Sequence, residues 1–208
     1  MNILLVDDHE LIRNGIARII SEEFPFSTLV EVGNGNSAER LARADKFDII
    51  IMDISMPDKN GLDVLKQLRS ESNKTPILIL SIHPENQYAL RSLRAGGNGY
   101  LTKNCGRTDL VNAINTVVKG RKFISPEVAE KLVSVFDNTV EKEQHELVSD
   151  RELQVLKLIA SGKTVSEIAN ELTLSVATIS TYRARLKEKM NMKNNAELTT
   201  YAINNHLV

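Results

Sequence analysis

The sequence holds a single cysteine, Cys105, among its 208 residues. An intrachain disulfide is therefore impossible, and this composition suits a reducing compartment such as the cytoplasm. No apolar run approaches the roughly 20 residues that a membrane-spanning helix needs. The first ten residues, MNILLVDDHE, carry no basic leader and do not resemble a secretory signal. We therefore expect a cytoplasmic protein without a membrane partner.

Neither sign of charge dominates the chain, whose formal net charge is −1. The charges are unevenly distributed along it, however. Residues 1–122 carry 16 basic and 15 acidic side chains, residues 123–148 carry 2 and 6, and residues 149–208 carry 8 and 6. The acidic middle segment predicts a linker that joins two domains, residues 1–122 and residues 149–208.

The first domain alternates short apolar runs with amphipathic stretches. The apolar runs are typical of strands and cover residues 2–6, 27–32, 47–52, 76–80 and 99–101. The amphipathic stretches are typical of helices and lie near residues 10–22, 37–45, 61–70, 85–95 and 107–119. This alternation predicts βαβ units, and three near-continuous runs of Ile, Leu and Val fit strands buried on both faces. We expect a doubly wound α/β domain with five parallel strands in the order 2-1-3-4-5.

The second domain contains no strand-like run and is predicted to be all-α, with four helices. Ser149, followed three residues later by Glu152, predicts a capping box, and Gly162 ends that helix. The remaining helices are expected at residues 165–172, from Ser175 to about Met190, and at about 196–204. Short helices joined by a tight turn and followed by a basic helix predict a helix-turn-helix.

Three carboxylates follow strands that should be neighbours in the sheet. Asp7 and Asp8 end the first strand, and Asp53 ends the third, so their side chains should converge. Like charges at such short range raise one another's pKa, and a hard divalent cation relieves the conflict. Mg²⁺ prefers oxygen ligands and is often shared with phosphate. We therefore predict an Mg²⁺ site made of these side chains and the backbone carbonyl of Ser55.

Two further polar residues, Ser81 and Lys103, follow the fourth and fifth strands and could donate to phosphate oxygens. Taken singly, an aspartate at a strand end is most often a helix cap, a serine after a strand is common, and a lysine is usually solvated. The complete set is hard to explain in that way. His9 has no second histidine or cysteine nearby in the sequence, so we interpret it as a loop or helix-cap residue and not as a metal ligand.

The motifs LLVDDH, IIIMDISMPDKNGLDVL, ILILSIH and GYLTK resemble, in this order, the receiver domain of two-component response regulators. Residues 149–208 resemble the four-helix LuxR-type DNA-binding domain. Together they resemble the NarL/FixJ family of response regulators, and the run TISTYRARLKEKM is similar to the GacA/UvrY branch. The resemblance implies a regulator of transcription. A sensor histidine kinase would phosphorylate it, and phosphorylation would control its dimerisation and its sequence-specific binding to double-stranded promoter DNA.

The resemblance also implies residue roles in the first domain. Asp53 would be the phosphoacceptor, Ser81 and Lys103 would contact the phosphoryl group, and the carboxylates named above would hold Mg²⁺. Tyr100 matches the family's switch aromatic and would turn inward when Ser81 moves. The alternative for Tyr100 is a partly exposed strand residue without a switch role.

In the second domain, residues 183–193 hold five basic side chains and one acidic side chain, which fits phosphate neutralisation in a DNA major groove. The alternative is an ordinary solvated helix face. The resemblance places the DNA-contacting side chains on this helix, at Thr178, Ser180, Thr181, Tyr182, Arg183, Arg185 and Lys187. Many relatives carry lysine at position 180 and histidine at position 182, so we expect an altered sequence preference. Ile179 and Leu186 should pack inward.

Two other classes of protein compete with this interpretation. An autonomous phosphoryl-handling enzyme would turn over a small substrate at the acidic cluster, but the sequence shows no additional general base or substrate pocket. A DNA-binding protein independent of phosphorylation would use its first domain only as a scaffold, and the complete acidic set argues against it. We expect a protein that is not an enzyme, beyond catalysing its own phosphoryl acceptance.

Overall fold

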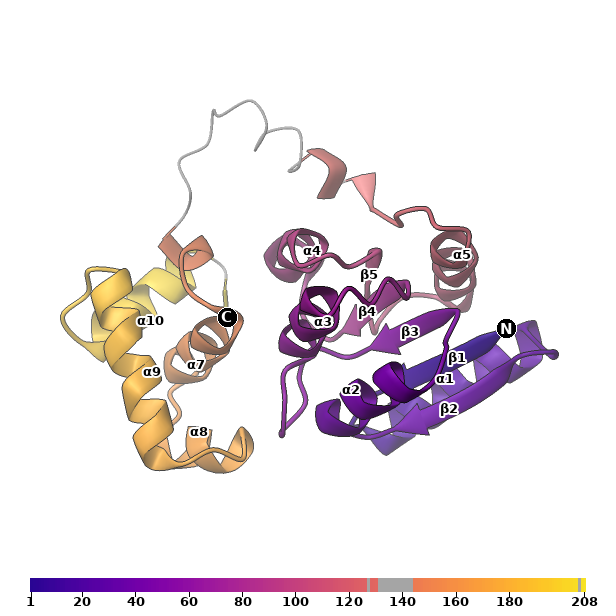
Figure 1. Ribbon diagram of the computed structural model, residues 1–208. Helices are drawn as coiled ribbons and strands as arrows, with labels where there is room; N and C mark the ends of the chain where they lie inside the picture. The colour runs from indigo at the N-terminus through magenta and orange to yellow at the C-terminus, as the bar shows by residue number, and fades with distance from the viewer. Residues whose placement is uncertain (127, 131–143, 206) are drawn as a thin grey trace. The chain divides into compact units, whose positions relative to one another are not determined.

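The structure, a computed structural model, describes residues 1–126, 128–130, 144–205 and 207–208. The chain forms two compact units, Met1–Asp137 and Asn138–Val208 (Figure 1). Most of the predicted acidic linker, residues 127 and 131–143, lies outside the described residues. The linker and the predicted domain boundaries therefore stay predictions.

The first unit is a five-stranded parallel sheet with helices on both faces (Figure 1). Its strands are β1 (Asn2–Val6), β2 (Thr28–Val32), β3 (Ile49–Met52), β4 (Ile77–Ser81) and β5 (Gly99–Thr102). Its helices are α1 (Glu10–Glu23), α2 (Gly35–Ala44), α3 (Gly61–Ser70), α4 (Glu85–Arg94) and α5 (Arg107–Val118). The observed order, β2-β1-β3-β4-β5, is the predicted one.

The core explains why three of the apolar runs are continuous. Every residue of β3 and β4 is buried, whereas the edge strand β2 is partly exposed. On one face of the sheet, alternate strand residues such as Ile3 and Ile51 pack against Ile20 of α1 and Ile114 of α5. Since helices cover both faces, side chains pointing either way must be apolar.

The strand register brings polar residues to one edge of the sheet. Val6 of β1 is aligned with Met52 of β3, so Asp7 and Asp53 follow at the same level. Asp53 continues the pairing of the two strands, because its N–H donates to Val6 O at 2.9 Å. Lys103 similarly follows the end of β5 and donates its N–H to Ser81 O at 2.7 Å.

The second unit is helical, as predicted. It contains the short 3₁₀ helix η1 (Gln144–Glu146) and the helices α7 (Asp150–Ala160), α8 (Val165–Glu171), α9 (Val176–Lys189) and α10 (Asn195–Asn204). The predicted capping box of Ser149 and Glu152 is confirmed, and Gly162 follows α7 with a φ of +84° that favours glycine. A second capping box, between Thr164 and Glu167, starts α8 and was not anticipated. Within the described part of the chain, no helix is long and apolar enough to cross a membrane.

Candidate functional site

At the carboxyl edge of the sheet, Lys103 lies between two buried carboxylates. Its Nζ atom is 2.7 Å from Asp7 Oδ2 and 2.7 Å from Asp53 Oδ2. None of the three side chains is more than 3% exposed. A buried charge without a partner would strongly destabilise the fold, so the ammonium group compensates two carboxylates at once. Lys103 is therefore not the solvated side chain of the alternative interpretation.

The Asp53 carboxylate is held by backbone donors as well. Its Oδ1 atom accepts the Ile54 N–H at 2.6 Å. Burial raises the pKa of Asp53 to about 6, against the lowering effect of Lys103, and the neighbouring Asp7 adds to the rise. A buried acid whose pKa lies close to neutral pH, beside a specific charged partner, is typical of functional sites.

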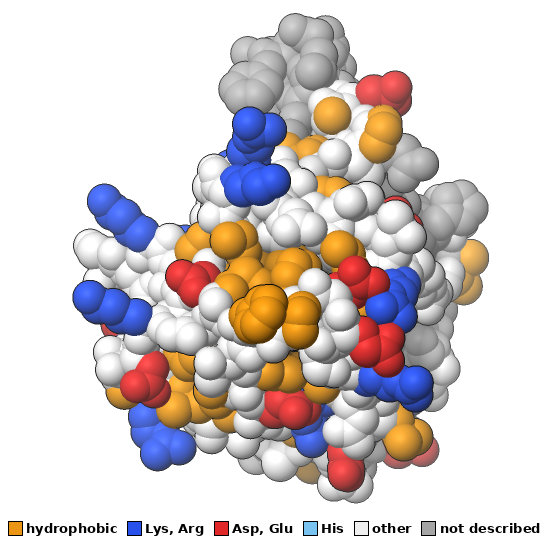
Figure 2. All heavy atoms as spheres, turned by 90° about the vertical axis from the view of Figure 1, so that its right-hand side faces the viewer, with side chains coloured by type: hydrophobic (Ala, Val, Ile, Leu, Met, Phe, Trp, Pro, Cys, Tyr) orange, Lys and Arg blue, Asp and Glu red, His pale blue; other side chains and the backbone are white. Residues whose placement is uncertain are grey.

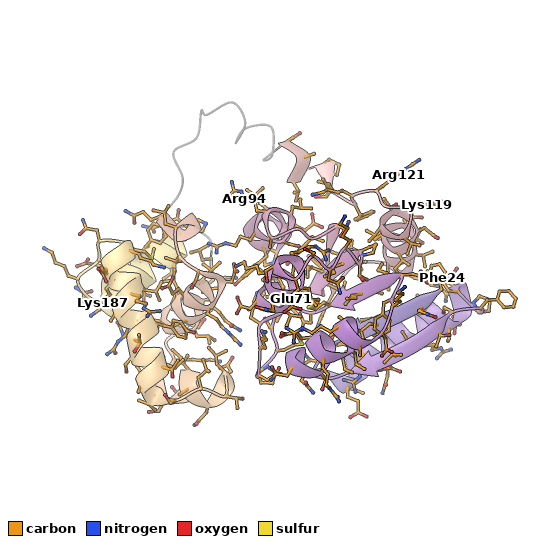
Figure 3. All side chains as sticks on the ribbon, in the orientation of Figure 1. Phe24, Glu71, Arg94, Lys119, Arg121 and Lys187 are labelled. Atoms are coloured by element: carbon orange, nitrogen blue, oxygen red, sulfur yellow. The ribbon has the colours of Figure 1, made fainter. Side chains whose placement is uncertain are left out.

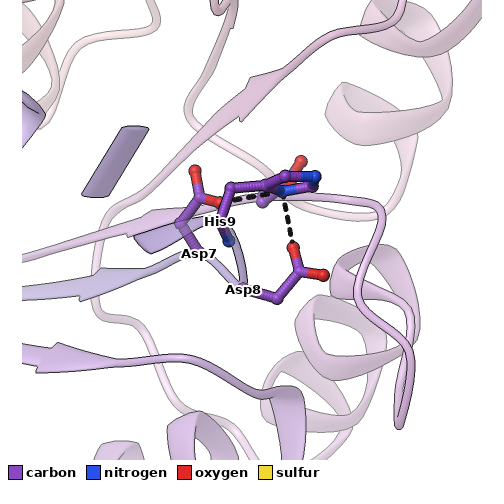
Figure 4. A group of neighbouring side chains, drawn as sticks. Asp7, Asp8 and His9 are labelled. Carbon is purple, nitrogen blue, oxygen red and sulfur yellow. Dashed lines mark hydrogen bonds and ion pairs between the residues drawn. The ribbon is translucent and has the colours of Figure 1, made fainter. Parts of the chain in front are cut away.

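Asp8 and His9 complete the cluster on its solvent side. His9 Nδ1 lies 2.9 Å from Asp8 Oδ1 and 3.4 Å from Asp7 Oδ1 (Figure 4). Together with Asp53, these residues offer ligand atoms that all lie within 4.8 Å of one another. The structure thus brings the three predicted carboxylates together. His9 does occupy the N-cap position of α1, as interpreted from the sequence, but its side chain makes no cap hydrogen bond and lies beside the acids.

His83 connects the other predicted residues of this edge. Its Nε2 atom is 2.9 Å from Ser55 Oγ, and its N–H donates to Ser81 Oγ at 3.3 Å. The Tyr100 hydroxyl donates to His83 O at 2.8 Å. Tyr100 is only 3% exposed, so it points inward and is not the partly exposed residue of the alternative. No role for His83 was predicted from the sequence, although this residue stands two positions after Ser81.

The loop between β3 and α3 is tightly fixed around Asp53. A Cβ atom added at Gly61 would lie 2.0 Å from Asp53 O, so α3 begins in direct contact with the backbone of the predicted phosphoacceptor. In the same loop, the Asp58 carboxylate accepts two backbone N–H groups at the start of α2, at 3.0 and 2.9 Å. The metal-ligand role predicted for the Ser55 carbonyl in this loop stays a prediction.

The predicted DNA-contacting residues lie together on α9, which Ser175 caps by accepting the Thr178 N–H at 3.0 Å. Ile179 and Leu186 are fully buried, as predicted. The predicted contact residues are all partly or fully exposed: Thr178, Ser180, Thr181, Tyr182, Arg183, Arg185 and Lys187. Two hydroxyls are already engaged within the helix, since the Thr178 and Ser175 hydroxyls bond each other and the Thr181 hydroxyl donates to Ala177 O.

One basic residue of this helix has a structural partner. Lys189 Nζ lies 2.7 Å from Glu152 Oε2, and Glu152, only 2% exposed, also belongs to the capping box of α7. Among the described residues, no carboxylate pairs with Arg183, Arg185 or Lys187, the last of which is labelled in Figure 3. The basic surface available to a nucleic acid is therefore smaller than the sequence count indicated.

Hydrophobic side chains also gather on the face of the molecule shown in Figure 2. Phe26, in the loop between α1 and β2, is 96% exposed. This loop precedes β2 and so lies at the amino edge of the parallel sheet. It is therefore separate from the carboxylates, which follow the strands.

Known families match both units of the chain. Residues 3–115 match the response regulator receiver domain, and residues 146–202 match the luxR family of bacterial regulatory proteins. Fold and sites thus define a response regulator that regulates transcription, and the chain belongs to this family. Within it, the chain is 35% identical over 211 residues to the response regulator UvrY of Escherichia coli O6:H1, covering 100% of this chain and 95% of UvrY. It is 32% identical over 209 residues to GacA of Pseudomonas viridiflava, covering 100% and 98%. These relatives place it in the GacA/UvrY branch.

Solved structures show the same architecture. RcsB from Salmonella enterica serovar Typhimurium, bound to promoter rprA in the presence of the phosphomimetic BeF₃⁻, is 25% identical with a TM-score of 0.64, covering 97% of this chain and 98% of that one. A LuxR-family response regulator from an Aurantimonas species is 34% identical with a TM-score of 0.59, covering 65% and 97%. The predicted fold class is confirmed.

Proposed function

We propose that Asp53 accepts a phosphoryl group from a sensor histidine kinase and that this event controls dimerisation and DNA binding. The observation that carries the proposal is Lys103, whose Nζ lies 2.7 Å from both Asp7 and Asp53 at the carboxyl edge of the sheet. A buried ammonium group between two buried acids supports Asp53 as the nucleophile and Lys103 as the cation that would pair with phosphate oxygens.

The donor set fits Mg²⁺, which would be held by Asp7, Asp8, Asp53 and the backbone carbonyl of Ser55. Carboxylates are the hard oxygen ligands that Mg²⁺ prefers, and Asp8, at 23% exposure, leaves the solvent side accessible to the waters that Mg²⁺ retains. When bound, the ion neutralises the acids and the oxygens of the incoming phosphoryl group.

The side chains of the site would carry out the transfer itself and bind the phosphoryl oxygens. An Asp53 oxygen attacks the phosphorus of a phosphohistidine, so that a P–O bond forms while the P–N bond breaks. Lys103 pairs with the phosphoryl oxygens, and the buried Ser81 hydroxyl donates to them. The reaction is acceptance of a phosphoryl group by the protein itself, so we propose no enzymatic activity on a separate substrate.

For DNA, we propose that α9 enters the major groove. Arg183, Arg185 and Lys187 lie on one helix without carboxylate partners among the described residues, which supports phosphate contact. Specific binding by such small domains usually pairs two of them on half-sites. Solved relatives include two RcsB dimers bound to two parallel DNAs, which supports a homodimer in this chain as well.

The test follows phosphate and oligomeric state in the same samples. Incubation with acetyl phosphate and Mg²⁺ should add one phosphate-sized increment to the intact mass, and Asp53→Asn or EDTA should abolish it. Sedimentation of the phosphorylated wild type should show a dimer. Labelling of the Asp53→Asn protein, or a monomer after complete phosphorylation of the wild type, would contradict the proposal.

A further inference from the structure

His9 stands within the acidic cluster at ligand spacing. Its Nδ1 atom lies 2.9 Å from Asp8 Oδ1 and 3.4 Å from Asp7 Oδ1 (Figure 4). Adjacent ligands on an octahedral ion with bonds of about 2.1 Å are about 3.0 Å apart. Both distances from the ring nitrogen are close to this spacing, and the ligand atoms of the whole cluster lie within 4.8 Å of one another.

The backbone holds His9 in this position independently of any ion. Its N–H donates to Asp7 Oδ1 at 2.9 Å, and its carbonyl accepts the Arg13 N–H at 2.9 Å as the first bond of α1. The ring itself caps nothing and is about half exposed, at 52%. The half-exposed ring therefore lies on the solvent side of the cluster and keeps its place beside the two acids through backbone bonds alone.

A nitrogen donor changes which metals such a site prefers. Oxygen ligands alone suit Mg²⁺, whereas imidazole suits divalent transition metals, whose affinity rises from Mn²⁺ through Co²⁺ to Ni²⁺. We propose that His9 Nδ1 is a metal ligand and that the cluster is a mixed nitrogen and oxygen site for divalent transition metals. This rests on the proposed Mg²⁺ site and adds a ligand and a second class of metal to it.

A bound transition metal would be held by the Nδ1 lone pair of His9 together with oxygens of Asp7 and Asp8. A neutral imidazole would bind through the Nδ1 lone pair and carry its proton on Nε2, so the ring would lose no proton to solvent. No oxidation or reduction is involved.

The experiment uses the full chain without added phosphate donor. Co²⁺ is titrated by its visible absorption and Mn²⁺ by the loss of its free-ion EPR signal, and Mg²⁺ by calorimetry. His9→Gln should weaken Co²⁺ and Mn²⁺ binding by about tenfold or more and Mg²⁺ binding far less. The Co²⁺-loaded wild type should show paramagnetically shifted imidazole protons that are missing in this variant. The matched control is His145→Gln, which removes an imidazole from the second unit and should leave all three affinities unchanged.

Two results are decisive. Equal Co²⁺ affinity in the wild type and in a folded His9→Gln protein, with Mg²⁺ still bound, would overturn the ligand role of His9 and leave the Mg²⁺ site standing. Failure of the wild type to bind Mg²⁺ at all would instead overturn the proposed metal site itself. Circular dichroism of each variant verifies the fold.

Discussion

At the scale of single residues, Asp53 combines deep burial with a charge. Its pKa is raised from 3.8 to about 6, mainly by burial. In the unfolded chain the acid therefore ionises first as the pH rises. This group therefore contributes its full share to the free energy of unfolding below about pH 3.8, where the acid is neutral in both states. That contribution is lost as the pH rises through about 6, and the free energy of unfolding falls by about 3 kcal/mol.

Asp53→Asn should therefore stabilise the metal-free protein at pH 7 by about 1–3 kcal/mol, because the variant has no charge to bury there and Lys103 keeps Asp7 as its partner. It should also flatten the decline in stability between pH 4 and pH 6. Urea unfolding in EDTA at several pH values measures both. Added Mg²⁺ should stabilise the wild type more than the variant. An Asp53→Asn protein with the wild-type stability and pH profile would refute this account.

A second prediction concerns Gly61, where the structure leaves no room for a side chain. An added Cβ would approach Asp53 O to 2.0 Å, so Gly61→Ala must displace either α3 or Asp53. We expect a loss of about 1–3 kcal/mol in urea unfolding and slower labelling by acetyl phosphate. Gly15→Ala is the matched control, since a Cβ there meets nothing within 4 Å inside α1. It should be neutral or stabilise the protein by up to about 1 kcal/mol. Equal effects at the two glycines would contradict the steric argument.

Some features of this site were predictable from the sequence and others were not. Asp7, Asp53 and Lys103 were predictable because apolar runs mark strand ends and the strand order makes those ends neighbours. The ring position of His9 was not, since its distance to Asp8 depends on a side-chain rotamer. The contacts of His83 were also not predictable from the sequence, because they depend on the path of the loop after β4 towards Ser55.

At the scale of elements, α7 and α9 are joined through one carboxylate. Glu152 Oε2 accepts the Ser149 N–H at 2.7 Å and lies 2.7 Å from Lys189 Nζ. Burial raises the pKa of Glu152, but Lys189 and the Ser149 bonds outweigh it and hold that pKa below its usual value. The stability from this group is thus present above the unfolded pKa and lost as the pH falls through the folded one.

Two variants separate the roles of this carboxylate. Glu152→Ala removes the bond from the Ser149 N–H and the ion pair, leaves the Ser149 hydroxyl bonded to the N–H of residue 152, and should cost about 1–2 kcal/mol at pH 7. Lys189→Met removes only the pair, whose lysine is 41% exposed, and should cost less than about 1 kcal/mol. Urea unfolding at pH 7 and below pH 4 measures both, and the difference between wild type and Glu152→Ala should shrink at the lower pH. If Lys189→Met cost as much as Glu152→Ala, the ion pair would dominate over the bond between the Ser149 N–H and the Glu152 carboxylate.

At the scale of the whole molecule, the proposed function requires that phosphorylation of the first unit changes DNA binding by the second. The carboxylates lie in Met1–Asp137, and the basic residues of α9 lie in Asn138–Val208. Under the proposed function, a dimer formed through the first unit makes the second half-site contact effectively intramolecular. Apparent affinity then rises without any new base contact.

The last prediction tests this coupling with two variants of the full chain. Arg183→Ala should weaken DNA binding both before and after phosphorylation, because a phosphate-contacting cation acts in either state. If the residue contacts one phosphate, the slope of log affinity against log salt should fall by about 1 per bound chain. Asp53→Asn should instead keep the affinity of the unphosphorylated protein and lose only the gain that acetyl phosphate gives the wild type. DNA titrations at several salt concentrations, with sedimentation of the same samples, distinguish the two effects. If fully phosphorylated wild type shows neither a dimer nor a higher affinity, the two units act independently and the proposed switch is wrong.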